Sequence, residues 1–142
     1  MQRVVIDTNI FISALLSKGG SPAKVVDAWR ERKFLVITCE AAILETQRVL
    51  NDLAATGKYA ITNDQIESVL HLLRTDAIQV PGQANVSGAI PQDPDDGKFL
   101  SVALEGDAGI IISGDKHLLD LSTYQEIVIR TARQFLNSLK TE

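Results

Sequence analysis

The stretch VVIDTN, residues 4–9, decides the fold, because three apolar residues are followed immediately by three polar ones. The stretch IIISGD, residues 110–115, has a similar arrangement. Short apolar runs rich in β-branched residues, without polar alternation, are typical of strands buried on both faces of a parallel sheet. In open α/β sheets the functional crevice lies beyond the carboxyl ends of the strands. We therefore predict a parallel sheet with Asp7 and Asp115 at its functional edge.

Helix and strand patterns alternate along the whole chain. The predicted strands are residues 3–6, 34–38, 77–80, 109–113 and 127–129. The predicted helices are residues 8–16, 41–54, 94–105 and 116–120, a helix through Arg32 with Ser21 as its N-cap, and two helices that start at the capping boxes Thr62–Gln65 and Thr131–Gln134. This alternation, with short connections, predicts one α/β domain over residues 1–142. Its central sheet should be mainly parallel, with helices on both faces.

The composition limits the class of protein. The 142 residues carry a net charge of −4 and include a single cysteine, Cys39, so no internal disulfide can form. The chain has only two histidines, which leaves zinc unsupported. The N-terminus lacks a signal-peptide pattern and no apolar run approaches the ~20 residues of a membrane span, so we expect a cytoplasmic protein with no membrane partner. The negative charge argues against a broad basic nucleic-acid surface, but divalent ions among clustered acids would reverse the local field.

Each acidic segment has a structural explanation beside the functional one. Asp7 fits a helix N-cap and Asp115 fits a β-turn. In the Asp-Pro-Asp-Asp segment 93–96, Asp93 fits an N-cap, and the acids after the proline fit a first helical turn favoured by the helix dipole. Three carboxylates within four residues nevertheless repel one another unless a positive charge lies nearby. We expect Asp96 at the edge of the buried face of its helix.

Glu45 is the least expected of the acids. It stands in an apolar stripe of its predicted helix, with Ala42 three residues before it and Val49 four residues after it. A buried glutamate is costly unless it is paired or bound to a cation. The alternative is an ion pair with Arg48 at i+3, which is common on helix surfaces. The apolar stripe favours a functional role.

Together these acids predict one metal site. Two acids at strand ends, one at a helix start and one on an apolar helix face can converge on a single pocket. Carboxylate oxygens without His or Cys select Mg²⁺ or Mn²⁺ over zinc. Such ions are the usual machinery of phosphodiester hydrolysis, in which a metal-activated water attacks the phosphorus.

Three segments resemble the signature segments of PIN-domain nucleases. They are VIDTNIFISALL (residues 5–16), DPDDGKFL (residues 93–100) and ISGDKHLL (residues 112–119). Within that family the chain is most similar to the branch related to the VapC toxins of toxin–antitoxin pairs. The likeness extends from about Arg3 to Leu136.

The resemblance implies a PIN-like fold and a set of functional residues. The implied catalytic and metal-binding residues are Asp7, Glu45, Asp96 and Asp115. The implied supporting residues are Thr8, Asn9, Asp93 and Ser113. The implied activity is an endoribonuclease that depends on Mg²⁺ or Mn²⁺ and hydrolyses RNA phosphodiester bonds. The implied partners are a second copy of the chain and a small antitoxin protein.

The chain departs from the family pattern at two places. His117 stands where this branch commonly has another Asp, from which we expect tuning of the site and no loss of activity. The segment 38–42 lacks the usual Ser-Pro helix start before Glu45.

Two other classes of function are compatible with an acidic α/β domain. A catalytically inactive PIN-like module would act through RNA or protein partners, and its acids would serve as helix caps. A receiver domain or an aspartate-nucleophile phosphatase is set aside, because the phosphatase pattern requires Asp at the position that Asn9 occupies. A receiver would require paired acids after the first strand.

Overall fold

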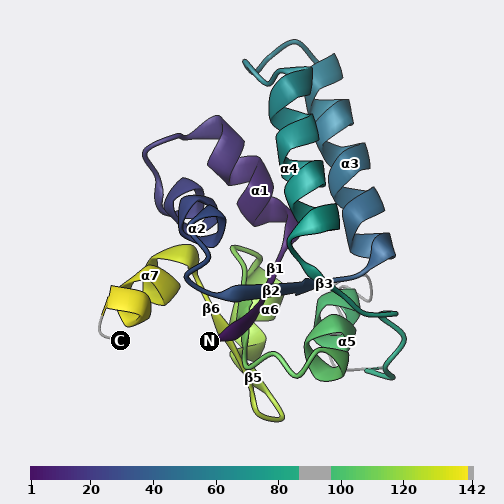
Figure 1. Cartoon of the computed structure of the whole chain (residues 1–142), viewed down its shortest axis with the longest axis vertical. Helices are drawn as coiled ribbons and strands as arrows, with labels where there is room; N and C mark the ends of the chain where they lie inside the picture. Colours follow the sequence, from purple (N-terminus) through teal and green to yellow (C-terminus); the bar gives the residue numbers. More distant parts are fainter. Residues whose placement is uncertain (87–96, 141–142) are drawn as a thin grey trace.

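A sheet of six strands runs through the part of the chain that the computed structural model describes, residues 1–86 and 97–140 (Figure 1). The strand order is β3-β2-β1-β4-β6-β5. The strands are β1 (Arg3–Ile6), β2 (Leu35–Thr38), β3 (Ile78–Gln79), β4 (Ile110–Ile112), β5 (Thr123–Tyr124) and β6 (Ile127–Arg130). The helices are α1 (Thr8–Leu16), α2 (Ser21–Arg30), α3 (Glu40–Ala55), α4 (Asn63–Thr75), α5 (Gly97–Glu105), α6 (Lys116–Leu121) and α7 (Ala132–Lys140). The predicted α/β class with a mainly parallel sheet is confirmed, since only β5 and β6 pair in the antiparallel sense.

Strand β1 lies in the middle of the sheet and pairs on both sides. Val5 lies opposite Ile37 of β2 and Ile111 of β4, both in parallel register. Successive side chains of a strand point to opposite faces, so Val4 and Ile6 enter one core while Val5 enters the other. Because both faces are covered, the central strands carry no polar alternation, as the sequence predicts.

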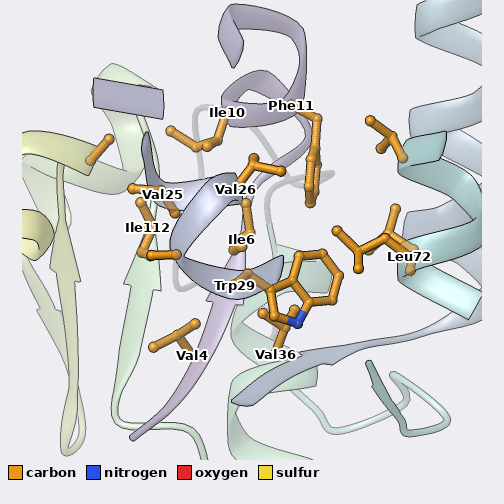
Figure 2. Close-up of a cluster of buried hydrophobic side chains, with 14 of the residues drawn as sticks. Val4, Ile6, Ile10, Phe11, Val25, Val26, Trp29, Val36, Leu72 and Ile112 are labelled. Carbon is orange, nitrogen blue, oxygen red and sulfur yellow. The ribbon is translucent and has the colours of Figure 1, made fainter. Parts of the chain in front are cut away.

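The two cores hold helices against opposite faces of this sheet. Figure 2 shows the first core, where Phe11 of α1 and Trp29 of α2 pack over Ile6 with ring centroids 6.3 Å apart. The second core packs Phe99 and Leu100 of α5 against Val5. Each fully buried side chain of this size contributes roughly 1.5–3 kcal/mol. Packing on both faces therefore fixes the carboxyl ends of β1 and β4, where the polar residues follow.

Three helices, α1, α4 and α7, start at the predicted capping residues. Thr62 and Gln65 form both bonds of a capping box, at 3.2 and 2.9 Å, and the box at Thr131 is also complete, at 3.1 and 2.9 Å. The prediction of Ser21 as an N-cap is wrong. Gly20 holds that position with no side-chain cap, and Ser21 is already helical. The helix can start there because Pro22 sits in the first turn, where a missing N–H leaves no bond unmade.

Other differences lie at the ends of the elements. Helix α3 is one residue longer at each end than predicted, and the first three residues of the predicted helix 94–105 lie outside the described residues. The sequence reading missed β5, because two residues carry no periodicity and the turn to β6 holds Gln125 at φ 54 in place of a glycine. None of the described helices is both long and apolar enough to cross a membrane.

Candidate functional site

Asp7 follows β1 directly and is the N-cap of α1. Its side chain is buried, with the residue only 3% exposed. The hydroxyl of Ser113 donates a hydrogen bond to Asp7 Oδ2 at 2.7 Å, and the backbone N–H of Asn9 donates to Oδ1 at 3.4 Å. The two residues meet because β1 and β4 are neighbours and the Asp7 N–H donates to the Ile112 carbonyl at 3.0 Å. The helix-capping hydrogen bond from the Asn9 N–H to Asp7 is long, whereas the hydrogen bond from the Ser113 hydroxyl to Asp7 is short.

Asp115 lies at the same edge, one turn beyond β4. It is the N-cap of α6, and its Oδ1 accepts a hydrogen bond from the Leu118 N–H at 3.1 Å. Its own backbone N–H donates to the Ser113 hydroxyl at 2.9 Å. The Ser113 hydroxyl therefore connects the Asp115 backbone to the Asp7 carboxylate. Oδ2 of Asp115 has no hydrogen-bond partner within the described part of the chain.

Glu45 projects from α3 beside the start of α1. The Thr8 hydroxyl donates to Glu45 Oε2 at 2.8 Å, and Lys98 Nζ lies 2.5 Å from Oε1. The two charged side chains are 24% and 23% exposed for Lys98 and Glu45, respectively. The alternative that Glu45 pairs with Arg48 is wrong, because Arg48 instead lies 3.9 Å from Asp52 on the solvent side of the helix. Glu45 is thus held at the margin of the core by a helix start and by a cation from α5.

The charges of these acids act on one another. Burial raises the pKa of Asp7 above its usual value, and the carboxylates of Asp115 and Glu45 raise it further. The hydrogen bonds from Ser113 and from the Asn9 backbone oppose this rise in the pKa of Asp7. A buried carboxylate with two acidic neighbours is stabilised by a cation, and an all-oxygen donor set suits a hard divalent ion.

The described acids do not by themselves complete a metal centre. Over residues 1–86 and 97–140, no three His, Cys, Asp or Glu side chains are close enough to hold one ion. Asp93 and Asp96, two of the expected site residues, lie outside the described residues. The donor chemistry therefore fits a divalent metal, while the ligand count depends on further oxygens.

The other expected residues take different places. Thr8 and Ser113 are buried and hold Glu45 and Asp7, respectively, whereas Asn9 is exposed at the rim and contributes its backbone N–H. Lys98 was missed by the sequence reading, although it lies two residues after Asp96 in the quoted DPDDGKFL segment. Its position in the sequence, two residues after the acids of this segment, is the signal from which it could have been predicted.

His117 is half-buried on α6. Its Nδ1 has no hydrogen-bond partner among the described residues. Nothing in the structure explains this choice of side chain.

The chain belongs to the PIN-domain family, whose model, described as "PIN domain", matches residues 3–117. Members of this family are in general nucleases that bind RNA and use divalent metals. The chain is also 35% identical over 120 residues to an uncharacterized protein of Methanocaldococcus jannaschii, MJ1680. That match covers 84% of this chain and 74% of the archaeal protein. The family assignment made from the three signature segments is confirmed.

Proposed function

We propose that this chain is an endoribonuclease that depends on Mg²⁺ or Mn²⁺ and hydrolyses RNA phosphodiester bonds. The observation that carries the proposal is the carboxylate of Asp7, buried at the sheet edge with Asp115 and Glu45 near enough to raise its pKa. Such a cluster is costly in the absence of a cation. In a family of nucleases that use divalent metals, a bound metal ion would offset this cost of the acidic cluster.

The proposed metal-binding residues are Asp7, Glu45, Asp96 and Asp115. A divalent ion bound among them would activate the attacking water and neutralise charge on the phosphate. Neighbouring hydroxyl groups hold two of these carboxylates in place. Ser113 fixes the orientation of Asp7, and Thr8 fixes that of Glu45. Asn9, which is exposed at the rim, and Asp93 are proposed as supporting residues.

We also propose that the protein is the toxin of a toxin–antitoxin pair, that it forms a homodimer, and that a small antitoxin protein covers the acidic edge. The support is the likeness of residues 5–16, 93–100 and 112–119 to the VapC-related branch. Co-purification from a host that also expresses the adjacent open reading frame tests this part. A chain that elutes as an isolated monomer would contradict both partner proposals.

A second candidate is a catalytically inactive PIN-like module that binds RNA or protein. The ion pair between Lys98 and Glu45 favours it, because one acid of the cluster is already neutralised without a metal. In this case the acids serve as helix caps and as partners of Lys98, and no divalent ion binds.

The decisive experiment is cleavage of a mixed-sequence single-stranded RNA in Mn²⁺, in Mg²⁺ and in EDTA. Asp7→Asn is compared with Asp27→Asn, which makes the same change at an exposed position of α2. We expect metal-dependent cleavage by the wild type and by Asp27→Asn, and none by Asp7→Asn. Cleavage that survives Asp7→Asn removes this site from the reaction. Intact RNA together with no heat of Mn²⁺ binding supports the inactive module.

A further inference from the structure

An open hollow of about 480 Å³ adjoins the candidate site. Asn9, Ser113 and Gly114 form the wall that it shares with the acidic edge. Its far side is formed by the first residues of α2 and α7, with Ser21 and Arg133 among them. The volume lies in the ~300–1,000 Å³ range of sites for small molecules.

The lining of this hollow is unlike the rest of the protein. The chain carries a net charge of −4, yet no Asp or Glu is among the described residues that line it. Ser13, Ser21 and Thr131 contribute hydroxyl-bearing side chains to this lining, and Arg133 is the one cation among its described residues. Neutral donors and a cation next to a cluster of acids suit an anion that approaches that cluster from one side.

The place of Arg133 supports a binding role. It lies in the first turn of α7, where a cation is unfavourable because the helix dipole is positive there. It is exposed and makes no hydrogen bond or ion pair with any residue of the described ranges. Neither the stability of its helix nor a partner among the described residues accounts for its charge.

The start of α2 faces the same space. Gly20, its N-cap, offers no side-chain bond to the first turn, and no acid lies in that turn. The backbone donors at this end thus lack the side-chain partners that most helix starts have. Arg133 and the uncapped end of α2 come from segments more than a hundred residues apart and meet across the hollow.

We propose that this hollow binds the nucleotide next to the scissile bond of a single-stranded RNA, with its phosphate between Arg133 and the start of α2. The proposal rests on the proposed ribonuclease function. It gives the RNA strand a direction, from the acidic edge past Asn9 and Ser113 toward α7. Phosphates that flank the cleaved bond need such neutral or basic contacts, because the acidic edge alone repels them.

Two variants test this with little expected cost to folding. Arg133→Gln removes an unfavourable charge from a helix start, and Ser21→Asp adds a favourable one, so both should melt at or above the temperature of the unmodified chain. Both should nevertheless weaken phosphate binding if the phosphate lies between these two residues. Lys140→Gln is the matched control, because it removes one cation from the other end of the same helix.

Binding is measured by fluorescence anisotropy with a mixed-sequence RNA 12-mer in Mg²⁺, in an Asp7→Asn background that leaves the RNA intact. We expect Arg133→Gln to bind roughly fivefold more weakly and to lower the slope of log affinity against log salt by about 0.7, the value for one phosphate contact on a single strand. Ser21→Asp should also weaken binding, and Lys140→Gln should not.

The cleavage assay on the unmodified protein, run in parallel, separates the two proposals. RNA that is cleaved, with affinities unchanged by Arg133→Gln and Ser21→Asp, overturns the assignment of the hollow and leaves the nuclease standing. RNA that is neither cleaved nor bound overturns both.

Discussion

Replacing Lys98 by Met should have opposite effects on the stability and on the metal affinity of the protein. Lys98 Nζ lies 2.5 Å from Glu45 Oε1, and about a quarter of each side chain is exposed. A hydrogen bond between charged groups contributes about 1.5–3 kcal/mol, and partial exposure lowers this to about 1–2 kcal/mol. Lys98→Met leaves Glu45 without its cation, so the metal-free protein should lose this amount, which lowers its Tm by about 3–6 °C.

The ion pair between Lys98 and Glu45, which stabilises the metal-free protein, should weaken metal binding. If Glu45 is a ligand, a divalent ion has to displace Lys98 from it. Lys98→Met removes this competition and one repelling charge, so about 1–2 kcal/mol returns as a Kd for Mn²⁺ that is roughly 5–30-fold lower. Thermal melts in EDTA and calorimetric titration with Mn²⁺ measure the two effects.

The control is Lys58→Met, an exposed lysine between α3 and α4, which should change neither quantity. An unchanged or weaker Mn²⁺ affinity of Lys98→Met would refute the reasoning. Glu45 would then be a structural partner of Lys98 and would not belong to a metal site. A lower Tm alone would not distinguish the two cases, which is why both measurements are needed.

Three further predictions concern stability. Ser113→Ala leaves the buried Asp7 carboxylate without its 2.7 Å bond and should cost about 1–3 kcal/mol in urea unfolding, so unchanged stability would contradict the bridging role of this hydroxyl. Burial raises the pKa of Asp7 in the folded state above 3.8. The ionised carboxylate therefore lowers the free energy of unfolding of the metal-free protein at neutral pH. This loss of stability disappears as the pH falls through the folded-state pKa to below 3.8. Asp7→Asn should therefore be more stable than the wild type in EDTA at pH 7, and its advantage should shrink in unfolding curves at lower pH; an advantage that grows toward low pH would show that the sign is wrong. A methyl group at Gly106 would overlap the Ile37 side chain, so Gly106→Ala should lower the free energy of unfolding by about 1–3 kcal/mol. A methyl group at Gly109 meets open space, so Gly109→Ala should unfold at the same urea concentration as the wild type.

Much of the arrangement at the sheet edge was predictable from the sequence. The apolar runs before Asp7 and Asp115 identify parallel strands buried on both faces, and residues after such strands gather at one edge. The structure places β1 beside β4, and the Ser113 hydroxyl connects the two acids. The two capping boxes are also as predicted, because their bonds join residues three positions apart.

Features that depend on contacts between distant segments were not predictable in the same way. Glu45 has a plausible partner one helical turn away in Arg48, yet its observed partner Lys98 is 53 residues distant. The hollow beside the site has the same origin, because Arg133 and Ser21 share no local pattern. The N-cap at Gly20 and the short strand β5 were missed because single residues and two-residue strands carry weak local signals.

The sequence by itself determined the order of the strands and helices other than β5, the family, and the acidic residues that end the central strands. The order of the elements follows from side-chain periodicity and from hydrogen bonds within a few residues, whereas the family follows from the likeness of residues 5–16, 93–100 and 112–119 to PIN-domain segments. Only the tertiary structure decided which charges face each other. The packing of α3 and α5 against the central strands brings Lys98 to Glu45. The packing of α2 and α7 leaves a hollow beside the acidic edge, and no carboxylate is among the described residues that line it. Electrostatic partners depend on distances in space, which the folded chain alone sets.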